Sequence, residues 1–297
     1  MFTCRVCYST YNVTETLKAN SKNVIALELG KGWWGMGYFG NVSLWLQMTI
    51  EYKSGYKQII TSDLSWKGNK SAWVYDNIYN GTTYDERLAI SKWNTVEYND
   101  AEWNNATTVV KPNGTLEAQP EPPIKIIQNL KPTKVTNPKE GVYIFDFGQN
   151  FSGWCKLKLP KLTENNIITL IHSEVLSAAG TIEVANLRTA VQTDKFISSG
   201  NNLNVEFEPA FTYHGFRFVQ IEGLPMAPTL DSIIARVIST DIKNTSTISF
   251  SSELFNELQH NIYWTHVSNY MSIPTPCNQR DERVGWTADT HLYVFNF

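Results

Sequence analysis

Apolar and polar residues alternate along most of this chain, and that period of two constrains its fold more than any other feature. Between residues 43 and 52, an apolar residue or tyrosine occupies every second position. The stretches 155–159 and 205–208 alternate in the same way, whereas 142–147 and 167–171 are apolar on both faces. Alternation is typical of half-buried strands, and short apolar runs suit strands inside a sandwich. The chain up to about residue 250 is therefore predicted to be β.

The period changes after Phe250. Apolar residues then recur at steps of three and four, which predicts a helix capped by Ser251 or Ser252 and ending before Pro274. So few residues follow this helix that its apolar face cannot be buried within them, and we expect a helical domain that is cut off. The face consists of Leu254, Phe255, Leu258, Ile262 and Tyr263.

Proline marks a domain boundary. The segment Ala118–Ile124 carries three prolines in seven residues. Proline fixes φ and lacks an N–H, so this segment cannot be an inner strand. We expect a linker here between two β-domains, over 1–118 and 123–240, with the helical segment following at 247–297.

The composition excludes two classes of partner. The 297 residues have a net charge of -3, and the sequence has no basic stripe of the kind that binds nucleic acid. No apolar stretch approaches the ~18 residues that span a membrane, so no membrane partner is predicted. The 10 Trp and 14 Tyr favour surfaces that stack on sugars or pack β-sandwiches.

Cysteines and glycosylation sequons leave the cellular compartment open. Cys4 and Cys7 form a C-x-x-C without a second pair, so ordinary thiols are expected rather than a metal or redox site. Eight N-x-S/T sequons suit an extracellular or secretory-pathway protein, but the N-terminus has no signal peptide. Either the protein is cytoplasmic or residue 1 is not its true start. The sequons begin at Asn12, Asn41, Asn69, Asn80, Asn105, Asn113, Asn150 and Asn244.

The densest charged cluster lies near the C-terminus. Between Gln279 and Asp289 there are three carboxylates, two guanidinium groups and Trp286. A solvated charged loop is one interpretation. A sugar site is the other, with an acid to protonate the leaving oxygen, polar groups to bind hydroxyls and an aromatic face to pack on the sugar. The spacing alone does not choose between them.

A resemblance does choose. The string from Ser272 to Asp289 resembles the signature of the α-L-rhamnosidases of glycoside hydrolase family 78. The resemblance implies a jelly-roll, carbohydrate-binding-like module over 1–118, a concanavalin-like β-sandwich over 123–240, and the truncated start of an (α/α) toroid of six hairpins over 247–297. Further segments resemble the family in the same order: Tyr8–Thr14, Leu29–Trp34, Thr61–Lys67, Ile78–Asp85, Ile144–Trp154 and Phe211–Arg217.

The resemblance also implies roles for single residues. Glu282 matches the general acid, and Arg280, Asp281, Trp286 and Asp289 are implied to bind the substrate, a rhamnose-containing glycoside or polysaccharide. The acid role needs a raised pKa, to which the two aspartates would contribute and which the arginines would oppose. No metal or cofactor is implied for catalysis. Calcium is implied only for the N-terminal module of some relatives.

The chain departs from the family in two ways. Pro276 replaces an aspartate that contacts sugar, and Asn278 replaces a proline. Proline has no polar side chain, so weaker sugar binding or a changed substrate is our hypothesis. The family inverts the anomeric centre, and its general base is implied to lie beyond Phe297. We therefore expect a fragment of a rhamnosidase that is inactive alone; the alternatives are a sugar-binding β-protein, including a degenerate pseudoenzyme, and a purely structural pair of sandwiches.

The histidines receive simpler interpretations. We expect His214 to satisfy a local hydrogen bond rather than to act in catalysis. His260 and His266 lie on or near the predicted helix and need no special role.

Overall fold

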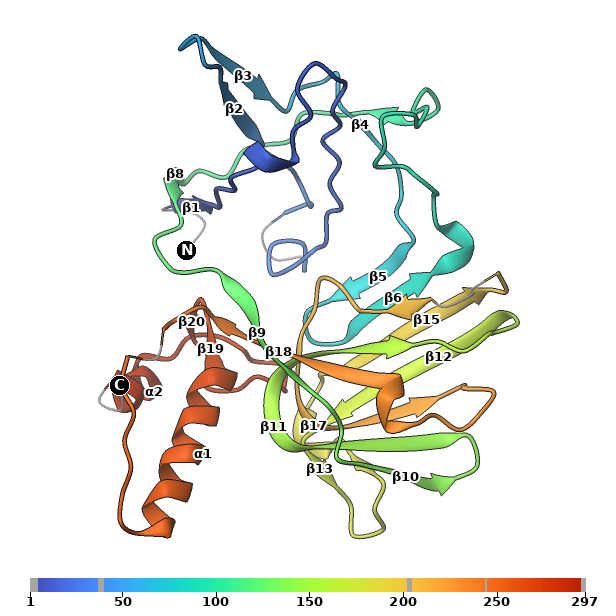
Figure 1. The fold of residues 1–297 in the computed structure, drawn as a ribbon, viewed down its shortest axis with the longest axis vertical. Coiled ribbons are helices and arrows are strands. Elements are labelled where there is room, and N and C mark those ends of the chain that lie inside the picture. The colour runs from blue at the N-terminus through green and yellow to red at the C-terminus, as the bar shows by residue number, and fades with distance from the viewer. Residues whose placement is uncertain (1–4, 37–39, 202–204, 244, 295–297) are drawn as a thin grey trace. The chain divides into compact units, whose positions relative to one another are not determined.

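The protein forms two compact units in its computed structural model, which describes residues 5–36, 40–201, 205–243 and 245–294 (Figure 1). Cys4 and the sequon at Asn244 lie outside the described residues. The first unit comprises Met1–Ala72 and Leu88–Pro120, and the second comprises Trp73–Arg87 and Glu121–Phe297. The domain limits drawn from the sequence stay predictions, and the structure adds that residues 73–87 belong to the second unit.

The first unit contains pairs of short strands joined by long connections. The proline-rich segment follows its last strand, where a linker was predicted, and Cys7 lies exposed in its first. The pairs are β1 (Arg5–Tyr8) with β8 (Thr115–Ala118), β2 (Gln47–Glu51) with β3 (Lys57–Thr61), and β4 (Lys67–Gly68) with β7 (Asn104–Asn105). The 3-10 turn η1 (Thr14–Thr16) also lies in this unit, and η2 (Glu86–Leu88) spans the point where the chain passes from the second unit back to the first.

The second unit is built on one curled ten-stranded sheet. Its strand order is β5-β6-β15-β12-β17-β11-β18-β9, and β10 and β16 also pair with β11. The predicted apolar strands at 142–147 and 167–171 lie within β11 and β12, which confirms them. The strands are β5 (Trp73–Asn77), β6 (Gly81–Asp85), β9 (Ile124–Leu130), β10 (Lys134–Lys139), β11 (Val142–Lys158), β12 (Glu164–Ser173), β15 (Thr193–Ser199), β16 (Glu206–Phe207), β17 (His214–Glu222) and β18 (Ile233–Thr240).

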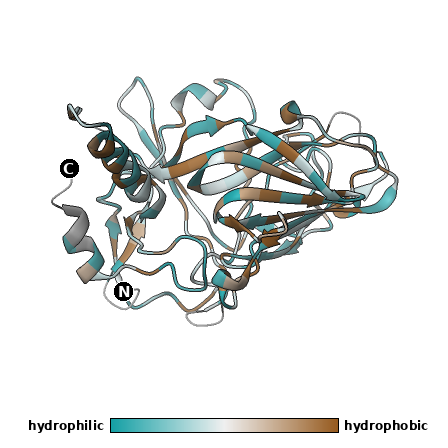
Figure 2. Cartoon of the chain, turned by 90° about the horizontal axis from the view of Figure 1, so that it is seen from below, coloured by the Kyte–Doolittle hydropathy of each residue, from teal (hydrophilic) through white to brown (hydrophobic). Residues whose placement is uncertain are grey.

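The core of this unit lies inside the sheet. Cys155, Leu157 and Leu159 are buried while the two lysines between them reach solvent, as the alternation predicted. Figure 2 shows the resulting change between hydrophobic and hydrophilic residues along the strands. Each buried Leu or Phe contributes roughly 1.5–3 kcal/mol relative to exposure, so the sheet supplies the framework of the unit. The fully buried phenylalanines are Phe145, Phe151, Phe196 and Phe216.

The hairpin β5–β6 extends the sheet at β15, to which β6 pairs in parallel. Gly81 begins β6 with φ +100° and packs against β15. A Cβ at Gly81 would lie 2.2 Å from the carbonyl oxygen of Thr193, so a larger residue there would push the hairpin away. The backbone N–H of Thr82 donates to Asp194 Oδ1 at 2.9 Å, which ties the hairpin to a buried carboxylate.

A helix follows the sheet, at the place where the period changes. α1 (Glu253–Asn269) starts after Ser252 and ends before Pro274, as predicted. Val267, near its C-terminal end, joins the core, and Trp264 packs against that core. Within the described part of the chain, the predicted apolar face stays uncovered, with Leu254, Phe255, Leu258 and Tyr263 exposed.

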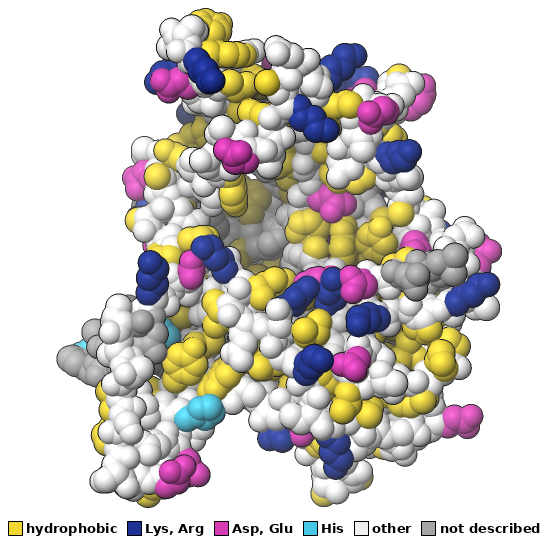
Figure 3. Space-filling view, in the orientation of Figure 1, with side chains coloured by type: hydrophobic (Ala, Val, Ile, Leu, Met, Phe, Trp, Pro, Cys, Tyr) yellow, Lys and Arg dark blue, Asp and Glu magenta, His cyan; other side chains and the backbone are white. Residues whose placement is uncertain are grey.

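Short elements complete the second unit. They are β13 (Val175–Leu176), β14 (Ile182–Glu183), η3 (Ala185–Leu187), η4 (Leu230–Ser232), β19 (Tyr270–Met271), β20 (Ile273–Pro274) and α2 (Thr287–Val294). None of the helices among the described residues combines the length and the apolarity that crossing a membrane requires. On the face drawn in Figure 3, Lys and Arg side chains lie interspersed with Asp and Glu.

Candidate functional site

The charged cluster singled out in the sequence lies on the loop between β20 and α2, and two buried side chains fasten that loop to the sheet. Asn278 is the first. Its Nδ2 donates to Ser152 Oγ at 2.7 Å, and Ser152 Oγ in turn donates to the carbonyl oxygen of Ser268 in α1. A Cβ on Gly215 would lie 2.3 Å from Asn278 Oδ1, so glycine leaves room for the amide. Asn278, a departure from the family pattern, thus joins loop, helix and sheet.

Arg283 is the second fastening residue, and only 2% of it is exposed. Its guanidinium donates to five oxygens in the described chain, and none of the five belongs to a carboxylate. Its charge lies 4.9 Å from the centre of the Tyr213 ring and 5.5 Å from that of Tyr79. Burial lowers the pKa of Arg283 below its ordinary value. The acceptors are the carbonyl oxygens of Ile78, Tyr213, Gln279 and Arg280 and the Oε1 of Gln192.

Between these anchors, the Glu282 side chain points into a set of donors. Trp286 Nε1–H donates to Oε1 at 2.7 Å, and Oε2 accepts from Arg280 Nε at 2.9 Å and from an Arg188 N–H at 3.4 Å. The Tyr79 hydroxyl donates to the Glu282 carbonyl oxygen at 3.0 Å. The side chain stays 20% exposed.

These donors favour the ionised carboxylate. The hydrogen bond from Trp286 is the largest cause that lowers the pKa of Glu282 below its ordinary value; partial burial opposes it, and Cys277 and Arg280 add to it. From the sequence, two aspartates were expected to raise the pKa of Glu282 and the arginines to lower it. In the described site these donors outweigh the effect of partial burial, so the pKa of Glu282 is lowered rather than raised.

Asp281 faces the segment after η3. Its Oδ2 accepts hydrogen bonds from the Thr189 hydroxyl and, at 3.4 Å, from the Thr189 backbone N–H. These bonds, the hydroxyl's foremost, hold the pKa of Asp281 below its ordinary value. Arg188 approaches Asp281 Oδ1 to 3.9 Å, as an ion pair without a hydrogen bond.

The structure brings together four of the five predicted site residues. Arg280, Glu282 and Trp286 share hydrogen bonds, and Asp281 is the chain neighbour of Glu282. Trp286 is 50% exposed among the described residues. Asp289 lies in the first turn of α2, where the helix dipole favours a carboxylate, and it shares no hydrogen bond or ion pair with the other four.

Sequence reasoning missed several residues of this site. Tyr79 and Arg283 lie within segments quoted for their resemblance, yet nothing in the pattern shows that they meet. Arg188 and Thr189 lie in no motif, and only the fold brings them to the loop. The backbone of Arg188 is unusual, with φ 58° and ψ -111°. L-residues rarely adopt this conformation, which typically costs about 1–3 kcal/mol.

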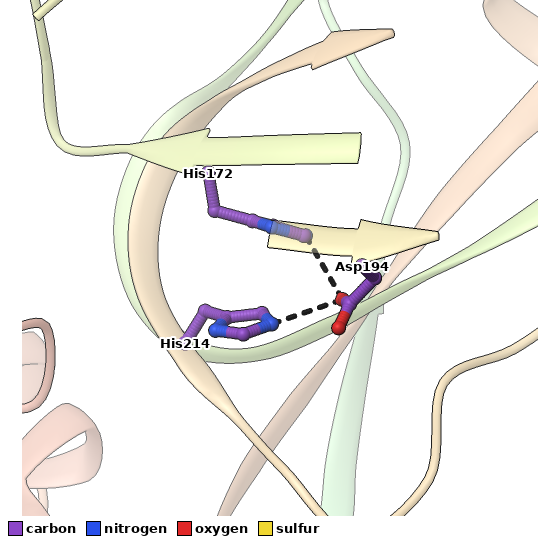
Figure 4. A group of neighbouring side chains, drawn as sticks. All are labelled: His172, Asp194 and His214. Atoms are coloured by element: carbon purple, nitrogen blue, oxygen red, sulfur yellow. Dashed lines mark hydrogen bonds and ion pairs between the residues drawn. The ribbon is translucent and has the colours of Figure 1, made fainter. Parts of the chain in front are cut away.

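A second polar group lies buried in the sheet and is a candidate for holding a metal ion. His172, Asp194 and His214 are fully buried, and each can offer a ligand atom within 4.8 Å of the others (Figure 4). The imidazole rings are stacked, with centroids 4.2 Å apart and planes 30° apart. The Nε2 atoms of both histidines face Asp194 Oδ2, His214 at 2.9 Å and His172 at 3.9 Å, whereas zinc takes each imidazole nitrogen at about 2.0–2.1 Å.

Hydrogen bonding suits this group better than metal binding. His214 Nε2 lies 2.9 Å from Asp194 Oδ2, which confirms the local hydrogen bond expected of this histidine. Burial, the largest single cause, would raise the pKa of Asp194, but His214, His172 and the Thr82 N–H together lower it below its ordinary value. His172 Nδ1 lies 3.0 Å from the carbonyl oxygen of Gln192, whose side chain accepts from Arg283. His172 therefore contacts Gln192, which in turn accepts a hydrogen bond from Arg283, the residue that fastens the loop.

The buried His172 predicts a loss of stability in acid. Burial is the largest cause that lowers the pKa of His172 from 6.5 to about 3, and partial burial lowers that of His266 to about 4. Below about pH 6.5 the unfolded chain therefore binds more protons than the folded chain, so stability is lost as the pH falls from 6.5 towards 3. Urea unfolding at pH 7.5, 6.0 and 4.5 should show a falling free energy of unfolding. His172→Phe should reduce the fall, and an unchanged value across this range would contradict the assignment.

Three domain models match the chain in succession. Residues 1–128 match the alpha-L-rhamnosidase N-terminal domain, residues 136–239 the bacterial alpha-L-rhamnosidase concanavalin-like domain, and residues 243–296 the bacterial alpha-L-rhamnosidase 6 hairpin glycosidase domain. An alpha-L-rhamnosidase of Streptomyces avermitilis is 34% identical over 98% of this chain and 29% of its own length. One of Formosa agariphila is 31% identical over 96% of this chain and 32% of its own.

Solved structures agree. A Streptomyces avermitilis alpha-L-rhamnosidase complexed with L-rhamnose has a TM-score of 0.88 and 32% identity, over 98% of this chain and 29% of that one. An alpha-L-rhamnosidase of Dictyoglumus thermophilum has a TM-score of 0.84 and 39% identity, over 86% and 29%. The predicted fold class, β-domains followed by the start of a six-hairpin domain, is thereby confirmed. The chain spans about 29–32% of the length of these curated relatives, and it belongs to the bacterial α-L-rhamnosidase family.

Proposed function

We propose that the chain is part of an inverting α-L-rhamnosidase that removes terminal non-reducing α-L-rhamnose from glycosides or polysaccharides. The observation that carries this proposal is the placement of Glu282 between Trp286 and Arg280 on a loop fastened at both ends. In the proposal Glu282 is the general acid that protonates the glycosidic oxygen as the sugar leaves. A general acid needs a fixed direction of approach, and the two anchors supply it.

The neighbouring residues would bind the sugar. Arg280 offers donors in a planar fork that suits hydroxyl groups, and Asp281 and Asp289 offer acceptors. The exposed Trp286 ring would pack on the C–H face of the sugar. Pro276, in place of a polar residue of the family, removes one contact, and this favours a second candidate function, a rhamnose-binding protein without catalysis.

The proposal requires a second carboxylate. An inverting hydrolase uses a general base about 6.5–9.5 Å from the acid, and the proposal assigns that base to chain beyond residue 297. Enclosure by further chain and a nearby carboxylate would both raise the pKa of Glu282, which the donors of the described site hold low. The hydrogen-bond donors that orient Glu282 would then no longer be the main influence on its pKa.

No metal takes part in this reaction scheme. Calcium belongs to the proposal only as a ligand of the N-terminal module in a longer protein. The buried group of His172, Asp194 and His214 would not be its site, because calcium takes six to eight oxygen ligands and this group offers one carboxylate and two imidazoles.

The proposal is tested on the native gene product. Its intact mass is measured, and turnover of an aryl α-L-rhamnoside is followed, with NMR to identify the anomer released first. We expect a product several hundred residues longer than this chain that releases rhamnose with inversion, and no turnover by the 297-residue chain alone. A product near 33.8 kDa that binds rhamnose without turnover would favour the binding protein instead.

A further inference from the structure

The residues after η3 reach the candidate acid from a different part of the fold. Arg188 and Thr189 lie between β14 and β15 of the sandwich, whereas Asp281 and Glu282 lie about ninety positions later in the sequence. Thr189 gives Asp281 Oδ2 two hydrogen bonds, and Arg188 gives Glu282 Oε2 one at 3.4 Å. Two consecutive sandwich residues thus hold two consecutive carboxylates of the loop.

The backbone at Arg188 is strained for an arginine. Its φ of 58° with ψ of -111° falls where glycine is favoured, because a Cβ crowds the neighbouring carbonyl. The arginine side chain is 55% exposed, and its guanidinium forms ion pairs with Glu282 and Asp281.

Arg188 differs from the other side-chain donors to the Glu282 carboxylate. Trp286 and Arg280 come from the same loop as the acid, so they move with it. Arg188 comes from the sandwich and is more exposed than Arg280, whose side chain is 33% exposed. It is therefore the donor that joins the Glu282 carboxylate to the sandwich, whereas the Tyr79 hydroxyl joins only the Glu282 backbone to it.

We propose that Arg188 and Thr189 are positioning residues that the β-sandwich contributes to the candidate active site, Thr189 fixing Asp281 and Arg188 fixing Glu282. Their assignment as parts of an active site rests on the proposed function. The contacts themselves belong to the folded 297-residue chain, so they can be tested whether or not the longer protein hydrolyses rhamnosides.

The test for Arg188 uses the indole N–H of Trp286 as a reporter, because that group donates to the Glu282 carboxylate. Its NMR signal, assigned by its loss in Trp286→Phe, is followed as the pH falls through the titration of Glu282. Arg188→Met should raise the inflection by about 0.2–0.7 pH unit, the range expected for half-exposed ion pairs. Arg188→Lys, which keeps the charge without the fork, should give a smaller rise. An inflection unchanged in Arg188→Met would overturn the role of Arg188.

Arg188→Gly separates positioning from a structural role. Glycine relieves the strained φ, so this variant should melt no lower than the wild type while raising the inflection as much as Arg188→Met does. A lower melting temperature with an unchanged inflection would show a structural residue and contradict the proposal. Arg236→Met is the matched control: it breaks an Arg–Glu pair at Glu208, whose Oε1 also accepts from a Trp indole, and should leave the Trp286 signal unaltered.

Thr189 is tested by keeping or removing its hydroxyl. Thr189→Val preserves the shape of the side chain but cannot donate, so the carboxyl 13C titration of Asp281 should move to higher pH. Thr189→Ser retains the hydroxyl and should titrate like the wild type. If valine and serine behave alike, Thr189 does not position Asp281. Failure of rhamnoside hydrolysis in the native product would overturn the proposed function without altering either titration.

Discussion

Glu282→Gln in the native gene product is expected to lower kcat on an aryl α-L-rhamnoside by about 10²–10⁴-fold, the usual contribution of a general acid. Glutamine keeps the size of the side chain and can still accept from Trp286, but it has no acidic proton to give to the leaving oxygen. The loss should be smaller on a dinitrophenyl rhamnoside, whose leaving group needs little protonation. Steady-state kinetics on both substrates measure the difference.

Glu208→Gln is the matched control for this prediction. Glu208 Oε1 accepts from the Trp154 indole at 2.8 Å and from Arg236 at 3.1 Å, the same kinds of donor that surround Glu282. It lies on the sandwich rather than on the loop, so its replacement should leave hydrolysis unchanged. Equal losses on the two substrates in Glu282→Gln would argue against an acid, and full activity in that variant would exclude the assignment.

Arg283→Met is expected to lower the free energy of unfolding by about 3–5 kcal/mol. Methionine fills much of the same space, but it leaves five oxygens without the donors they have now, and each buried acceptor left unpaired costs about 1–3 kcal/mol. Removing a buried charge offsets part of this cost, which is why the full sum is not expected. Urea unfolding at neutral pH measures the change.

The variant Lys131→Met supplies the comparison. Lys131 pairs with Asp231 at 3.1 Å, with both side chains about three-quarters exposed, so its loss should cost less than about 1 kcal/mol. Hydrogen exchange of residues 278–286 should rise in Arg283→Met and stay unchanged in Lys131→Met. A loss below 1 kcal/mol in Arg283→Met would mean that water reaches those oxygens and that the loop is not fastened by this residue.

Sequence patterns predicted the strands and the helix whose formation depends on residues close together in the chain. The strands around Phe145 and Ile168 and the helix from Glu253 follow from side-chain period, because each period repeats within a few residues. The turn to α1 was visible from Phe250 onward for the same cause. Glu282, Arg280 and Trp286 were found together because they lie within seven residues of one loop.

Contacts distant in sequence were not predictable. The parallel pairing of β6 with β15 joins residues more than a hundred positions apart, and no pattern in either segment specifies the other. Neighbouring residues of the loop also differ in burial, and no periodic pattern in the sequence predicts the difference. Glu282 faces donors near solvent, while Arg283 is buried against carbonyl oxygens. Arg188 carries no motif, so its approach to Glu282 depends entirely on how the sandwich folds.

The hairpin β5–β6 has a consequence for how this protein can be divided. The chain enters the second unit at residue 73, leaves it after 87, and returns at 121, so one cut in the proline-rich segment does not release two complete pieces. A piece that began there would lack two strands, expose the edge of β15 and deprive Asp194 of the Thr82 N–H. A variant in which the first unit is exchanged would therefore have to retain this hairpin to keep the sheet complete at β15.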